Sequence, residues 1–335
     1  MHICSVRSMP AFAIASALAL VGCSSDSPTA APAPTHPSTF TVGPAGSRTT
    51  ATTASVSRVW PTIANRQVLP VSGSLQRGSG VAAAATINSP FDLTFAGGKV
   101  LTGGTNWNLY MNCGAPSLQC WGSGTLSPSD FLKDLNRSRF ISLLDQYVTT
   151  PAWRSWAFDS LVGNDPNIPA NNNVLTDNEL FNILYSAVQV TGQSGYRALY
   201  HVFLPQGVDV CPSPTACYSP DVPSTFAFCA YHGAVTFTDG THIVYSVEPY
   251  QAVPGCQNPN GLPHGTVDAT ASTLSHEFFE AATDPDLDAW FNVLTGNEVG
   301  DLCFVFEYNE QIATHNYQIQ SEYSNALHAC SDNAR

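Results

Sequence analysis

The stretch LSHEFFEAATDPDLDAW, residues 274–290, carries the clearest structural and chemical signal in this chain. Apolar side chains such as Leu274 and Phe278 surround its charged ones, which indicates a helix that is buried rather than solvated. Proline cannot continue a helix and restricts the residue before it, so the helix must end before Pro285. The sequence therefore predicts a helix over about residues 267–283.

His276, Glu277 and Glu280 follow the spacing of the HExxH zinc motif, with Glu in place of the second His. Residues four apart lie on one helix face, so His276 and Glu280 can hold one ion from adjacent turns. Glu277 lies about 100° further around the helix and would reach a water molecule instead. Zinc accepts carboxylate oxygen as well as imidazole nitrogen. The other interpretation is an ordinary acidic helix that matches the pattern by chance.

A catalytic zinc usually has three protein ligands, so the motif needs a third one from elsewhere. In thermolysin-like zincins a Glu some 18 to 25 residues past the second ligand supplies it, and both Glu298 and Asp301 fall in that window. Asp284, near the same face of the helix, is a further candidate, although an Asp-Pro-Asp segment also suits a turn. Cys303 would hold this segment in place through a disulfide.

The roles that follow are those of a metal-dependent hydrolase. Glu277 would act as the general base, and His232 would be a further ligand or would stabilise an oxyanion, unless it is a structural histidine. We expect Zn²⁺ rather than Ca²⁺, because Ca²⁺ prefers an all-oxygen ligand set and His276 offers nitrogen. A serine hydrolase is disfavoured, since no GxSxG motif occurs.

The N-terminus predicts export. An apolar run of eleven residues, Ala11–Val21, is too short to cross a membrane and fits a signal peptide over residues 1–22. It ends in Leu-Val-Gly-Cys, which resembles a bacterial lipobox, so Cys23 is predicted to carry a lipid anchor. The alternative is a plain secretory signal. We expect an outer-membrane or cell-surface lipoprotein, or otherwise a periplasmic or secreted protein.

Composition agrees with export and excludes one class of partner. The formal net charge is −13, so no basic footprint for nucleic acid is present. Residues 23–84, rich in Ser, Thr, Ala and Pro, are predicted to form a flexible tether. Of ten cysteines, Cys4 and Cys23 fall in the N-terminal segment, and the even remainder suits disulfides in an oxidising compartment. Short loops favour the pairs Cys113–Cys120 and Cys211–Cys217.

Residues 85–335 are predicted to form one disulfide-stabilised domain of the α/β or α+β class, with the zincin-like helix packed on a mixed sheet. Helices are predicted from Ser127-Pro128, with proline at the first position, and from Thr176, with a capping box to Glu179. Alternating patterns predict strands at residues 106–111, 198–204, 224–231 and 242–247.

Several short motifs occur in an order that resembles the EXORDIUM or phosphate-induced protein 1 family, over about residues 100–330. They are YHVFLPQGVDVC at 200–211, FCAYHGAV at 228–235 and PNGLPHGTVDATASTLSHEFFEAATDPDLDAWF at 259–291. The resemblance implies the fold and an extracellular location. Plant members are secreted cell-wall proteins linked to growth, and their pattern lacks the His-Glu pair at His276 and Glu277.

Two functions are therefore expected. The first is an exported, lipid-anchored, zinc-dependent hydrolase of the peptidase type, acting on a peptide or a cell-envelope polymer. The alternative is a non-catalytic, EXORDIUM-like envelope or carbohydrate-interacting protein with a structural metal site.

Overall fold

The structure is a computed structural model, and it describes residues 38–42, 51–54, 91–113, 126–148, 156–170, 174–257, 261–304 and 307–332. These residues belong to one compact unit, His36–Arg335. The predicted signal peptide and the predicted anchor at Cys23 lie outside the described residues.

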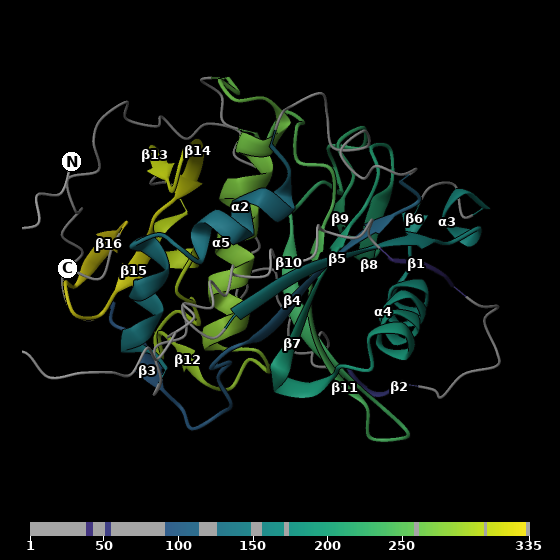
Figure 1. Cartoon of the computed structure of the whole chain (residues 1–335), viewed down its shortest axis with the longest axis horizontal. Helices are drawn as coiled ribbons and strands as arrows, with labels where there is room; N and C mark the ends of the chain where they lie inside the picture. Colours follow the sequence, from purple (N-terminus) through teal and green to yellow (C-terminus); the bar gives the residue numbers. More distant parts are fainter. Residues whose placement is uncertain are drawn as a thin grey trace, which may run out of the picture. The chain divides into compact units, whose positions relative to one another are not determined.

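A seven-stranded mixed sheet forms the centre of this unit (Figure 1). Neighbouring strands are parallel from β1 to β11, whereas β10 and β2 run antiparallel to their neighbours. The order is β1 (Ser38–Thr41), β5 (Trp156–Asn164), β4 (Gly104–Met111), β7 (Ala198–Phe203), β11 (His242–Glu248), β10 (Tyr231–Phe237) and β2 (Ala51–Ala54). The expected α/β fold with a mixed sheet is thus confirmed, as are three of the predicted strands.

The edge strands β1 and β2 fall inside residues 23–84, the segment predicted to be a tether. Their sequences, STFT and ATTA, are short and rich in Thr, a residue that suits strands. Four-residue strands at a sheet edge carry too little apolar periodicity to be recognised from sequence. This part of the predicted tether is therefore sheet, and the domain boundaries at 22 and 84 otherwise stay predictions.

The predicted strand at residues 224–231 is wrong. The sheet strand begins only at Tyr231 and runs to Phe237. Before it, a turn forms in which the amides of Thr225 and Phe226 donate to the Val222 carbonyl. Hydrogen bonds within this turn therefore take the place of the strand pairing that the alternating Phe226 and Phe228 suggested. His232 consequently lies near the start of a strand and does not follow the end of one.

Both predicted helix starts are confirmed, the capping box at Thr176 is present, and Ser127 forms a second capping box that was not predicted. Helix α2 (Pro128–Leu135) begins at the cap Ser127, and helix α4 (Asp177–Thr191) begins at Thr176, whose hydroxyl accepts from the Glu179 amide. The apolar pattern after α2 continues in a separate 3₁₀ segment, η2 (Phe140–Gln146), rather than in one long helix. Smaller elements are β3 (Thr94–Phe95), α3 (Asn167–Ala170), β6 (Val174–Leu175), η4 (Gly195–Arg197), β8 (Asp209–Ser213), β9 (Ala216–Tyr218) and β12 (Trp290–Phe291).

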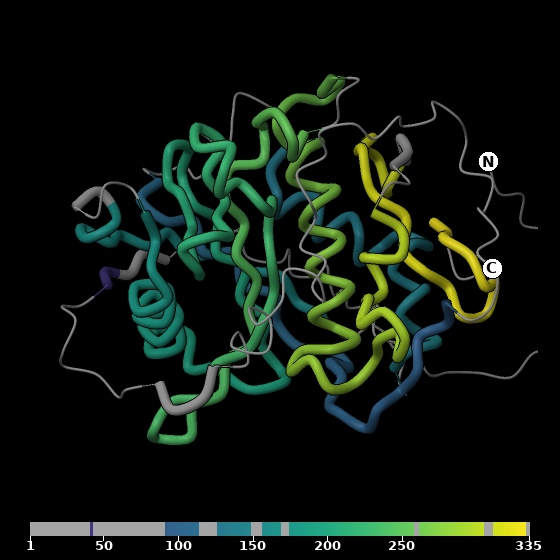
Figure 2. The backbone as a smooth tube through the Cα atoms, turned by 180° about the vertical axis from the view of Figure 1, so that it is seen from behind, coloured from purple at the N-terminus to yellow at the C-terminus, as the bar shows by residue number. Residues whose placement is uncertain are grey.

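Helix α5 (Thr266–Thr283) matches the helix predicted from residues 274–290. It covers one face of the sheet, while α4 covers the other (Figures 1 and 2). On its far side α5 packs against β14 (His315–Gln320), which forms a hairpin with β13 (Glu307–Ile312). Every residue from Val267 to Thr283 is buried, so charged residues on any side of this helix must find partners inside the protein.

Three disulfides join Cys211 to Cys217, Cys229 to Cys256, and Cys303 to Cys330. The first confirms a predicted pair. Cys113 is also disulfide-bonded, but the predicted partner Cys120 lies outside the described residues. Disulfides of this kind indicate an extracellular or periplasmic protein.

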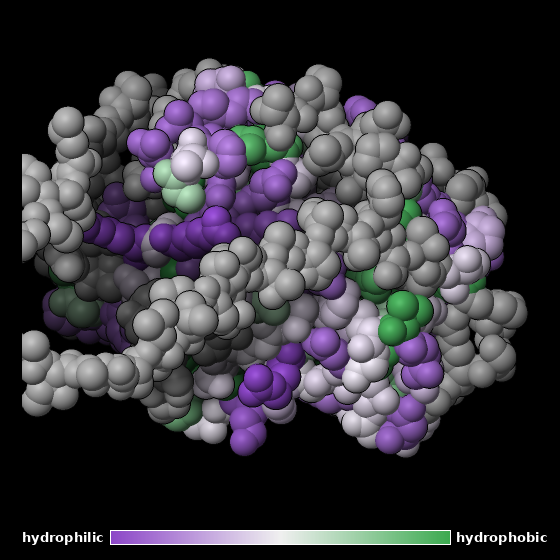
Figure 3. Space-filling view, viewed as in Figure 1, coloured by the Kyte–Doolittle hydropathy of each residue, from purple (hydrophilic) through white to green (hydrophobic). Residues whose placement is uncertain are grey.

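The described surface is mainly hydrophilic on the face in Figure 3, with apolar residues in small groups. Among the described residues, no helix has the length and apolar character that crossing a membrane requires.

Candidate metal centre

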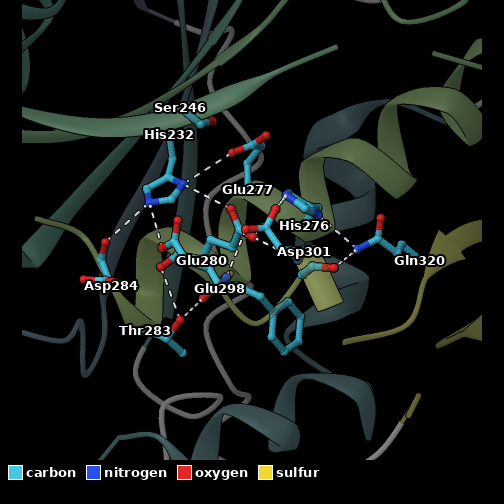
Figure 4. Close-up of polar contacts among 12 residues, drawn as sticks. His232, Ser246, His276, Glu277, Glu280, Thr283, Asp284, Glu298, Asp301 and Gln320 are labelled. Carbon is cyan, nitrogen blue, oxygen red and sulfur yellow. Dashed lines mark hydrogen bonds and ion pairs between the residues drawn. The ribbon is translucent and has the colours of Figure 1, made fainter. Parts of the chain in front are cut away.

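Helix α5 presents its acidic motif to two different neighbours (Figure 4). Glu277 points toward the sheet, where His232 projects from β10, whereas His276 points toward Gln320 at the end of β14. Consecutive helix residues diverge by about 100°, which explains this division. Glu280, one turn further along, lies between the two histidines.

The first group comprises His276, Glu280 and Asp301. Nε2 of His276 lies 3.1 Å from Oε1 of Glu280 and 3.9 Å from Oδ1 of Asp301. The Asp301 amide also donates to Oε1 of Glu280, at 3.1 Å. One ligand atom from each residue lies within 4.8 Å of the others, so this group could hold a metal ion.

The second group comprises His232, Glu277 and Glu280, with the same 4.8 Å limit. Nδ1 of His232 lies 3.5 Å from Oε2 of Glu277 and 3.4 Å from Oε2 of Glu280. Sequence reasoning placed His232 near the site and left its role open. The structure brings its ring to the centre of the acidic cluster, from a strand 44 residues before the helix motif.

The three downstream acidic candidates take different positions. Asp301 faces His276, whereas Oε1 of Glu298 lies 3.5 Å from Nε2 of His232. The Asp284 carboxylate accepts from the amides of Asp288 and Ala289, at 2.6 and 2.7 Å. Asp284 is therefore a turn-stabilising residue, and its carbonyl lies 3.4 Å from Nε2 of His232.

The surrounding fold holds these side chains in place. Cys303, two residues after Asp301, is tied to Cys330, and Cys229, three residues before His232, is tied to Cys256. Gly300 lies directly against the His276 ring, so a Cβ at position 300 would overlap the ring. The φ of Gly300 is −80°, so glycine is needed here for close approach and not for its backbone conformation.

The Gln320 side chain contacts both His276 and Gly300. Its Nε2 donates to the Gly300 carbonyl at 2.9 Å and lies 3.0 Å from Nδ1 of His276. An amide nitrogen facing Nδ1 suits a ring that accepts there, whereas an amide oxygen in the same place would accept from Nδ1–H and leave Nε2 free to bind a metal.

Sequence reasoning missed Glu322, Gln320 and Glu248. Glu322, in β15 (Glu322–Ser324), is fully buried, and neither of its oxygens has a hydrogen-bond partner. The alternation of Gln318, Gln320 and Glu322 in a C-terminal strand pattern is a signal that could have indicated a polar inner face.

Burial and charge act against each other throughout this cluster. Burial lowers the pKa of His232 and His276, but the adjacent carboxylates more than reverse this and raise both pKa values well above the usual range. Burial raises the pKa of Glu280, and the two histidines then lower it to about 2. Burial also raises the pKa of Glu298 and Asp301 well above normal. In the absence of a cation, protons must therefore supply the missing positive charge.

Several atoms in the cluster lack a hydrogen-bond partner, although they are buried: Nε2 of His276, Oε1 of Glu277, Oε1 of Glu298 and Oδ1 of Asp301. Among the described residues, no Lys or Arg forms an ion pair with the cluster carboxylates, whose recorded partners are histidines. Buried unpaired carboxylate oxygens are costly. The donor set of imidazole and carboxylate thus fits a divalent cation, with zinc as a suitable member of that class.

Comparisons of the chain with family models, with curated proteins and with solved structures found no match.

Proposed function

We propose that this protein is an exported, lipid-anchored, zinc-dependent hydrolase whose substrate is a peptide or another cell-envelope polymer. The observation that carries the proposal is the arrangement around α5. Three donor residues, His276, Glu280 and Asp301, converge on one point. Glu277, which shares Glu280 with this group through the second one, has a buried oxygen without a hydrogen-bond partner.

The roles of the residues follow from that arrangement. His276, Glu280 and Asp301 would hold the ion, which would activate water and polarise the scissile carbonyl. Glu277 would accept the proton of the attacking water. His232, whose Nδ1 lies 3.5 Å from Glu277, would orient that carboxylate and stabilise negative charge on the substrate oxygen. The Glu298 side chain, 10% exposed, is the most open of the cluster, so a substrate would approach from its side.

A second candidate function is supported by the depth of the site. The side chains of His276 and Asp301 are 0% and 2% exposed, which suits a metal that stabilises the fold. In this second function the chain is a non-catalytic, EXORDIUM-like envelope protein that interacts with carbohydrate. The two functions differ in what they require of Glu277, because only hydrolysis needs a free base.

The decisive experiment combines metal content with hydrolysis. The intact protein, purified with its disulfides formed, is analysed for bound metals and assayed against a library of quenched fluorescent peptides and peptidoglycan fragments. We expect the purified protein to contain zinc and the His276→Ala variant to contain less. We also expect the protein to hydrolyse a substrate and Glu277→Gln to lower the rate about 100-fold or more. Glu277→Gln keeps the shape of the side chain, so the metal-free variant should unfold at nearly the same temperature as the metal-free parent protein.

His328→Asn is the matched control, because His328 is exposed and distant in sequence from the motif, and Asn tolerates its positive φ of 52°. It should keep full zinc content and activity. Hydrolysis that survives Glu277→Gln unchanged would leave the structural-metal function in place of the hydrolase.

A further inference from the structure

Glu280 has two oxygens that face two different histidines. Oε1 lies 3.1 Å from Nε2 of His276, and Oε2 lies 3.4 Å from Nδ1 of His232. A carboxylate placed in this way can bridge two cations, and paired metal ions in proteins lie about 3.5–4 Å apart. The single residue therefore belongs to both of the groups described above.

His232 is already oriented as a metal ligand. Its Nδ1 faces the carboxylates of Glu277 and Glu280, while its Nε2 faces the Asp284 carbonyl at 3.4 Å and Glu298 at 3.5 Å. Metal-bound histidines commonly donate their other N–H to a carbonyl or carboxylate in this manner. The corresponding outer contact of His276 is between its Nδ1 and the Gln320 amide, at 3.0 Å.

Two carboxylate oxygens of the cluster also lack a hydrogen-bond partner. Oε1 of Glu277 has no hydrogen-bond partner although the residue is 1% exposed, and Oε1 of Glu298 has none either. One divalent cation beside His276 compensates two of the four negative charges that Glu277, Glu280, Glu298 and Asp301 carry when all are ionised. A second cation on the side of His232 would neutralise a large part of the remainder.

We propose that His232, Glu277 and Glu280 form a second divalent-cation site, joined to the first through the Glu280 carboxylate. The site suits a transition-metal ion of the zinc class, because it combines one imidazole with two carboxylates. Binding here would engage the Glu277 carboxylate, which hydrolysis needs as a free base. Excess metal would therefore inhibit the enzyme, and this consequence, unlike the binding itself, rests on the proposed function.

The test is a count of bound ions. The intact protein is stripped with chelator and titrated with Zn²⁺ by calorimetry, and the ions retained after desalting are measured by elemental analysis. We expect two zinc ions per chain at saturation. His232→Ala and His276→Ala should each retain one, Glu280→Gln should weaken both sites, and His328→Asn should retain two.

Glu277→Gln provides a second variant in case His232→Ala does not fold, since it removes a ligand of the second site and keeps its volume. It should also lower the count from two to one. A count of one in the unmodified protein, or of two in both His232→Ala and Glu277→Gln, would overturn the second site. Two bound ions without any hydrolysis would instead remove the proposed function and leave the second site standing.

Discussion

His201 and His232 lie in one row across the sheet, each paired in register with Ser246, and both are almost completely buried. Their surroundings differ. Nδ1 of His201 bonds Ser246 at 2.7 Å and Nε2 bonds Asn106 at 3.1 Å, and burial lowers its pKa to about 3. His232 faces three carboxylates, which raise its pKa well above normal against the opposing effect of burial.

The comparison shows that burial alone does not decide the charge of a histidine. Neutral partners satisfy both nitrogens of His201, so neither nitrogen hydrogen-bonds a carboxylate directly. The cluster around His232 has more carboxylates than histidines, together with oxygens that lack hydrogen-bond partners. We therefore infer that the His201 network serves structure, and that the cluster needs an additional positive charge.

The largest expected effect is the removal of metal. A ligand present at about 1,000 times its Kd stabilises the folded state by about 4 kcal/mol, so chelation should lower the Tm by roughly 8–16 °C. Scanning calorimetry with and without chelator measures this. His201→Gln should show the same drop, because His201 is outside the cluster. If chelation leaves the Tm unchanged, the cluster around His232 would need no metal, and the proposed difference from the His201 network would be wrong.

Gly300→Ala should have the next largest effect. The new methyl group overlaps the His276 ring, so the imidazole must move away from Glu280 and Asp301. We expect zinc affinity to fall about 10- to 100-fold, as when a supporting contact of a metal ligand is lost. Competition with a zinc-binding dye measures it. Val299→Ala, at the adjacent buried position, should lower stability and leave zinc affinity unchanged.

The His201 network predicts a distinct pH dependence. The folded pKa of about 3 lies below the unfolded value of about 6.5, so the stability that neutral His201 contributes is complete above pH 6.5 and declines below it. Between pH 6.5 and 5 the loss should reach about 2 kcal/mol. Gln at position 201 cannot be protonated. The free energy of unfolding of His201→Gln, measured in urea, should therefore fall below that of the unmodified protein at neutral pH, and this difference should shrink as the pH falls. A constant deficit would mean that His201 is not held neutral.

The smallest effect is expected for His328→Asn. The His328 side chain is 54% exposed, and its ion pair with Asp92 spans 2.9 Å at the surface. Exposed pairs contribute less than about 1 kcal/mol, so the free energy of unfolding should change by less than about 0.5 kcal/mol. Urea titration measures this. A larger change would show that surface histidines also stabilise this fold, which would weaken the contrast with the buried ones.

Local features of the sequence determined a large part of the fold. The Ser127-Pro128 start, the capping box at Thr176 and the stop before Pro285 located three helices, because each signal depends only on residues within one or two turns. The spacing of His276, Glu277 and Glu280 is also local, since the helix repeat places them. Cys211 and Cys217 paired as their short separation suggested.

Only the tertiary structure decided how the site is assembled. Asp301 faces His276 while Glu298 faces His232, although both lie at suitable distances along the chain. Glu322 and Gln320 reach the site from strands that no helix spacing could relate to it. The edge strands β1 and β2 likewise depend on partners more than 100 residues away. These contacts depend on how distant segments pack together, and that information is absent from any short stretch of sequence.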